Sequence, residues 1–147
     1  MVNGKKARLF RIRAGDSIKD LNVVVPSVQE TIIVRGVVRY ADGAPATNTT
    51  VRFIPAKLPG IQGDALEDTD AKGRFSIKIF RGLQGELHGD FFASGERYEN
   101  CRQVQSFIKQ SGKTGTMIKT PPIKINPQRD LYNLVLTFPF RACNRKR

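Results

Sequence analysis

The sequence predicts an all-β domain, an antiparallel sandwich of about seven strands. Three observations indicate it: short runs alternate apolar and polar residues with a period of two, turn residues separate the runs, and no helices at βαβ spacing connect them. The 147 residues leave room for one hydrophobic core. No apolar run approaches the roughly 18–20 residues that a transmembrane helix needs.

Five runs have the length and alternation of half-buried strands. The first ends in a turn at residues 41–45, and the second ends at Pro55, because proline cannot donate a hydrogen bond to a neighbouring strand. The third follows a turn at residues 70–73, and glycines make the fourth less regular. The five predicted strands span residues 34–40, 51–53, 74–79, 85–92 and 131–138.

The rest of the chain flanks or interrupts these strands. Two further runs, at residues 9–13 and 21–25, form a predicted N-terminal strand pair, which either opens the sandwich or closes a preceding repeat. Residues 93–127 form a long insertion, expected to be loop with at most a short helix over 101–109. The chain therefore divides into the N-terminal pair (1–30), the sandwich (31–140) and a basic tail (141–147).

The chain is strongly basic, with 25 Lys and Arg against 13 Asp and Glu and a net charge of +12. The excess divides into +3 for residues 1–30, +5 for 31–140 and +4 for 141–147. Part of the middle share occupies outward positions of the predicted strands, and such a basic face would favour an anionic partner, an envelope polymer or an acidic protein. The residues of this predicted face are Arg35, Arg39, Arg52, Arg74 and Lys78.

Residues that could carry chemistry are few: one His, two Cys and no Trp. His88 stands on a predicted strand with no nucleophile motif near it, so we expect a surface or hydrogen-bonded histidine. Residues 68–73 match the opening of a calcium loop, but Lys72 and Ile79 stand where oxygen ligands are needed, so a hairpin turn is expected. We expect no catalytic residue, no cofactor and no metal, and hence no enzyme.

Three segments, residues 34–45, 50–53 and 69–77, carry a resemblance to a known family. A first strand that ends in a glycine-containing turn plus Pro, followed by a Thr-Asp-x-x-Gly-x-Phe hairpin, resembles the carboxypeptidase regulatory-like domain. The resemblance implies an Ig-like, transthyretin-like β-sandwich. Glycine in this pattern allows close packing or a positive φ. The matching turn and core residues are Gly36, Asp42, Gly43, Pro45, Asp70, Gly73 and Phe75.

This resemblance also implies a function and a location. It implies a non-catalytic structural or interaction module of an exported or cell-envelope bacterial protein, with a protein, an anionic polymer or adjacent domains of a larger chain as partners. Because the relatives are often exported, Cys101 and Cys143 suggest one disulfide, and two separate thiols in a reducing compartment are the alternative. Residues 1–16 show no apolar signal-peptide region, so the extracytoplasmic location depends on the resemblance and the cysteine pair.

Two alternatives compete with this interpretation. A hydrolase of purine catabolism shares the transthyretin-like fold, but that family relies on more than one histidine and on a C-terminal Tyr-Arg-Gly-Ser signature, whereas this chain has one His and lacks the signature. The second is a nucleic-acid-binding β-barrel of the oligonucleotide-binding type. In that barrel the outward Arg and Lys would contact phosphates, and Phe80, Phe92 and Tyr98 would stack on bases.

Overall fold

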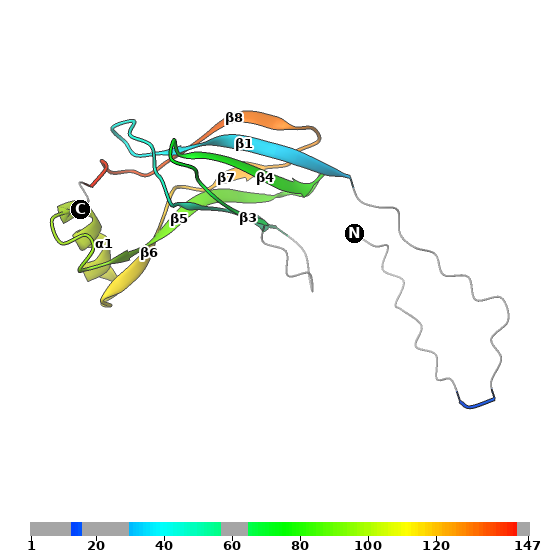
Figure 1. The fold of residues 1–147 in the computed structure, drawn as a ribbon, viewed down its shortest axis with the longest axis horizontal. Coiled ribbons are helices and arrows are strands. Elements are labelled where there is room, and N and C mark those ends of the chain that lie inside the picture. The colour runs from blue at the N-terminus through cyan, green and yellow to red at the C-terminus, as the bar shows by residue number, and fades with distance from the viewer. Residues whose placement is uncertain (1–12, 16–29, 57–64, 144–147) are drawn as a thin grey trace.

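The computed structural model describes residues 13–15, 30–56 and 65–143 (Figure 1). Two β-sheets lie one over the other with a single short helix at one end, which confirms the predicted all-β sandwich. The elements are β1 (Thr31–Arg39), β2 (Thr50–Pro55), β3 (Ala65–Asp68), β4 (Arg74–Phe80), β5 (Gly85–Ser94), α1 (Arg102–Ser111), β6 (Gly115–Lys119), β7 (Ile123–Ile125) and β8 (Leu131–Thr137).

The strands form a three-stranded and a five-stranded sheet. The first has the order β4-β1-β8, and the second has the order β3-β2-β5-β6, with β7 also paired to β5. Neighbours are antiparallel except β1 and β8, which run parallel. The sheets do not close into a barrel, so the oligonucleotide-binding barrel is wrong as a fold.

The core lies between the sheets and follows the alternation of the sequence. In β4 the side chains of Phe75, Ile77 and Ile79 are buried, whereas the intervening polar residues are exposed. The inner faces of both sheets meet in an aromatic cluster, in which the Phe91 and Phe138 rings pack edge to face with centroids 5.1 Å apart. This core fixes which side of each strand faces solvent.

The parallel pair of β1 and β8 depends on a glycine. A Cβ on Gly36 would lie 2.3 Å from the carbonyl oxygen of Leu134, so only glycine lets the two backbones approach this closely. The pairing register shifts between Val34 and Gly36, and Asn133, opposite this shift, adopts a φ of +62°. The result is a bulge in β8, where residues 132 and 133 lie opposite Arg35 alone.

The expected loop character of the 93–127 insertion is wrong. It contains the predicted short helix as α1, but also β6 and β7, which both pair with β5. Ile118 of β6 and Ile125 of β7 are buried, and these two side chains pack the short strands against the core. Strands of five and three residues next to glycine or proline are too short to show a clear alternation.

Other sequence-based predictions fall outside the described part of the chain. The N-terminal strand pair lies there, apart from Arg13 at its edge, and so does the end of the basic tail after Cys143. Within the described residues, no helix is both long and apolar enough to cross a membrane.

Candidate binding face

Four of the five predicted cationic residues share the outer surface of the three-stranded sheet. Arg35 and Arg39 are exposed on β1, and Arg74 and Lys78 are exposed on β4. We call these four residues the basic face. Arg52 lies on β2, in the other sheet, and therefore does not belong to it.

The register of β1 and β4 brings these cations together. Arg35 lies opposite Ser76, so Arg74 and Lys78 are its diagonal neighbours on the same surface, at about 7–8 Å. Arg39 lies four residues further along β1, about 13 Å away at the usual rise per residue. The arrangement is a cluster of three cations with a fourth beside it.

Within the described part of the chain, a carboxylate compensates one of these charges, that of Arg74. The Arg74 Nε donates to Asp70 Oδ2 over 2.7 Å. Asp70 Oδ1 accepts from the backbone N–H groups of Arg74 and Lys72, and the hydrogen bonds from Arg74 are the main cause that lowers the pKa of Asp70 below its usual value of 3.8. Asp70 is therefore a firmly ionised partner for Arg74.

Among the described residues, the other three cations have no such partner. Arg35 Nε donates to the neutral Ser76 Oγ over 3.3 Å. No carboxylate in the part of the chain that the structure describes lies within ion-pair distance of Arg35, Arg39 or Lys78. The basic face thus carries three exposed positive charges that no described carboxylate compensates.

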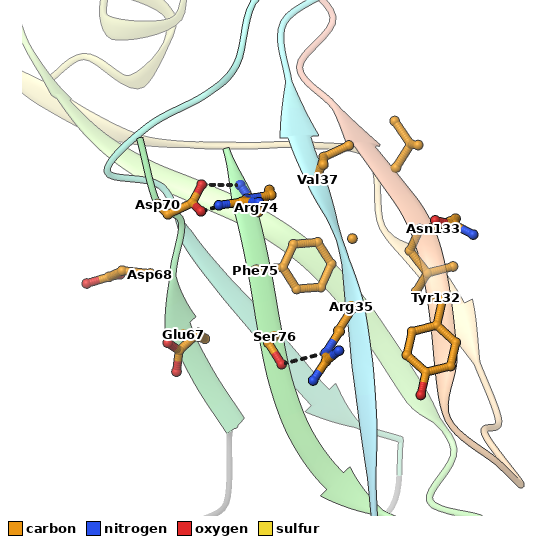
Figure 2. Close-up of a pocket in the computed structure, with 13 residues that line it drawn as sticks. Arg35, Val37, Glu67, Asp68, Asp70, Arg74, Phe75, Ser76, Tyr132 and Asn133 are labelled. Atoms are coloured by element: carbon orange, nitrogen blue, oxygen red, sulfur yellow. Dashed lines mark hydrogen bonds and ion pairs between the residues drawn. The ribbon is translucent and has the colours of Figure 1, made fainter. Parts of the chain in front are cut away.

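A shallow groove of about 640 Å³ runs across this sheet (Figure 2). On one side the Tyr132 ring lies beside Arg35, with the guanidinium carbon 5.9 Å from the ring centroid, a weak cation–π contact. On the other side Glu67 and Asp68 of β3, together with Asp70, form an acidic rim. The groove therefore has a cationic and aromatic half and an acidic half.

The residues of the family-like motif shape turns and core. Gly43 and Gly73 adopt φ values of +84° and +72°, and Phe75 is buried. Pro45 forms a bridge with Arg39, and Asp42 accepts from the backbone N–H groups of Ala44 and Ala142. Two more motif residues act nearby: Gly36 at the bulge and Asp70 in the hairpin before β4. These residues hold the basic face in shape, and none of them adds a cation to it.

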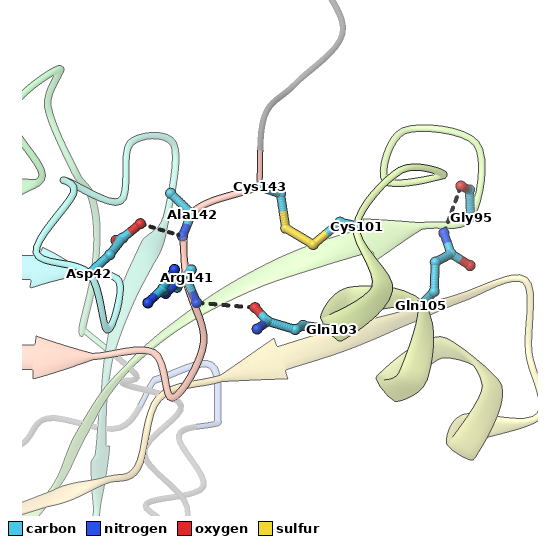
Figure 3. Close-up of a disulfide and its surroundings, with 8 residues drawn as sticks. All are labelled: Asp42, Gly95, Cys101, Gln103, Gln105, Arg141, Ala142 and Cys143. Carbon is cyan, nitrogen blue, oxygen red and sulfur yellow. Dashed lines mark hydrogen bonds between the residues drawn. A yellow bond between two sulfur atoms is a disulfide. The ribbon is translucent and has the colours of Figure 1, made fainter.

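The two cysteines are joined by a disulfide, with their Cα atoms 5.6 Å apart (Figure 3). Cys101 immediately precedes α1, and Cys143 follows β8 by a short segment. Two hydrogen bonds support the link, because the Arg141 N–H donates to Gln103 Oε1 and the Ala142 N–H donates to Asp42 Oδ2. The disulfide therefore anchors α1 to the end of the three-stranded sheet.

A buried polar cluster on the five-stranded sheet was not predicted. Asp90 Oδ2 lies 3.3 Å from both His88 Nε2 and Arg52 Nε, and both His88 and Asp90 are buried. Burial lowers the pKa of His88 more than the nearby carboxylate raises it. Sequence offered one signal: alternate residues 88 and 90 of one strand must share a face.

Of the three aromatic residues proposed for base stacking, the structure exposes two, on different sheets. Phe80 is exposed on β4 and Phe92 on β5, whereas Tyr98 is buried against Phe91. The described residues contain no group of three or more His, Cys, Asp or Glu side chains placed to hold a metal ion.

Comparisons with protein-family models, curated proteins and solved structures found no match. The resemblance to the carboxypeptidase regulatory-like domain therefore stays a prediction from the motif residues.

Proposed function

We propose that this domain is a non-catalytic interaction module whose basic face binds an anionic partner, an acidic protein or an acidic polymer. The observation that supports it is the set of three cations, Arg35, Arg39 and Lys78, which share one exposed sheet surface and have no carboxylate partner among the residues that the structure describes. Hydrogen-bonded strands fix the spacing of these charges, so a partner would meet a preformed surface.

The expected affinity is modest and depends on salt. An exposed ion pair contributes roughly 0.2–1 kcal/mol, so three contacts together contribute about 1–3 kcal/mol. The net charge of +12 adds long-range attraction, which speeds encounter with a polyanion and weakens as ionic strength rises.

The proposed setting is outside the cytoplasm, in an exported or cell-envelope protein of a bacterium. The Cys101–Cys143 disulfide supports it, since such bonds persist in oxidising compartments. Rigid strands and a covalently anchored helix suit an accessory domain attached to other domains.

Isothermal titration calorimetry of polyglutamate binding, at several salt concentrations, tests the proposal. The variant Arg35→Gln/Arg39→Gln/Lys78→Gln should bind about tenfold more weakly and with a shallower salt dependence. The control Arg97→Gln/Arg102→Gln/Lys109→Gln removes the same charge from exposed positions in and before α1 and should bind almost as the unmodified protein does. Equal losses in the two variants would mean that net charge alone, and no particular face, drives binding.

Single-stranded DNA provides the competing outcome. Among the described residues, the exposed aromatics on the sheet of the basic face are Tyr132 and Phe80, which are too few for a row of stacked bases. Polyglutamate should therefore compete effectively with an oligothymidine. Much tighter binding of the oligothymidine at equal salt would favour the nucleic-acid alternative.

A further inference from the structure

Among the strands that the structure describes, none pairs with the outer edge of β8. Within the described residues, β8 pairs only with β1, and it forms one edge of the three-stranded sheet. Figure 1 shows β8 along the margin of the sandwich, with β1 on its inner side.

The direction of these backbone groups follows from the hydrogen bonds that are made. The Phe138 N–H donates to the Arg39 carbonyl over 2.9 Å, and the Phe140 carbonyl accepts from the Ala41 N–H. Backbone groups of alternate residues in a strand point to opposite sides. The N–H and C=O groups of Val135 and Thr137 therefore point away from β1, toward the open edge.

Apart from the bulge at Asn133, β8 lacks the features that usually protect an edge. Its sequence, Leu-Tyr-Asn-Leu-Val-Leu-Thr, contains no charged residue and no proline. Each of the other edge strands that the structure describes, β3, β4, β6 and β7, carries at least one charge. Natural proteins place charges or proline on exposed edges to prevent unwanted pairing, so the uncharged β8 edge is available for pairing.

We infer that an extended segment of a partner protein, with acidic side chains on one face, adds as a fourth strand to the β8 edge. This inference rests on the proposed function and names its partner as an acidic β-strand. Main-chain hydrogen bonds to Val135 and Thr137 bind the added strand, and the basic face selects acidic side chains on it.

Charge complementarity favours this occupant over a second copy of the chain. An added strand lies two strand spacings, about 10 Å, from β1, so acidic side chains on its outward face share the sheet surface that carries Arg35 and Arg39. A second copy paired through its own β8 would place two basic faces side by side in molecules of charge +12. The β8 edge therefore suits an acidic partner better than self-association.

The test uses fluorescein-labelled seven-residue peptides of alternating Glu and Val, measured by fluorescence anisotropy. The variant Val135→Pro removes an N–H that points to the open edge and leaves the β1 hydrogen bonds in place. It should bind the Glu peptide at least tenfold more weakly, whereas Val135→Thr, which keeps this N–H, should lose far less affinity. Circular dichroism verifies that both variants fold.

Three peptide arms keep the inference falsifiable even if Val135→Pro unfolds. A Glu peptide N-methylated at every backbone nitrogen keeps its charge and loses all its backbone donors, and it should bind at least tenfold more weakly to the unmodified protein. Equal binding of the two Glu peptides would overturn strand addition and leave the basic-face proposal standing. Equal binding of a Lys-Val peptide would instead contradict the proposed function, and a dimer that Val135→Pro dissociates in sedimentation would assign the edge to a second copy.

Discussion

Replacing both Cys101 and Cys143 with serine should lower the free energy of unfolding by about 4 kcal/mol. The bond closes a loop with a sequence separation of 42 residues. For a loop of this length, the loss of unfolded-chain entropy corresponds to about 4 kcal/mol at 25 °C. The variant should nevertheless fold, because the Gln103 and Asp42 hydrogen bonds still hold the segment after β8.

Urea denaturation measures this loss, with circular dichroism and tyrosine fluorescence as probes. The oxidised protein should unfold at a clearly higher midpoint than the double serine variant, and addition of reductant should bring the two curves together. The dependence on urea should be steeper without the crosslink, since the unfolded chain then exposes more surface. A loss below about 1 kcal/mol, with an unchanged slope, would refute the loop-closure reasoning.

Three further substitutions test single features of the fold. Gly36→Ala should lower the free energy of unfolding in urea by at least about 1–3 kcal/mol, because its Cβ would clash with the β8 backbone. In the control Gly95→Ala, the nearest atom to the new Cβ is 3.6 Å away and the loss should be far smaller, so equal losses would contradict the close approach. Because burial lowers the pKa of His88, the unfolded state binds the proton more readily, so stability should fall as pH drops below about 6.5; His88→Asn should lose this dependence, and an unchanged pH profile would exclude His88 as its source. Asp70→Asn should lower the melting temperature at pH 7, and its difference from the unmodified protein should shrink as pH falls below 3.8 through the lowered pKa; a difference independent of pH would argue against the carboxylate.

The strands that could be predicted from sequence are those that bury one face. β1 and β4 alternate buried and exposed residues over seven or more positions, so their existence and outward cations follow from the pattern. β3, β6 and β7 were missed because they are only three to five residues long. An alternation of apolar and polar residues cannot be recognised over so few positions.

Sequence reasoning also could not assign strands to sheets. Alternation places Arg52 outward on its strand, but pairing partners far along the chain decide which sheet that strand joins. The same limit applies to the parallel pairing of β1 with β8, since their register involves residues about 100 positions apart. The buried cluster at His88 depends on the pairing of β2 with β5, which brings Arg52 directly opposite it.

Mapping polyglutamate binding by NMR tests the central claim most directly. In a titration of ¹⁵N-labelled protein, amide signals of β1 and β4 around Arg35, Arg39 and Lys78 should shift most, and these shifts should reverse when salt is added. Shifts concentrated in α1, or confined to residues before Glu30 and after Cys143, would contradict the assignment of binding to the basic face.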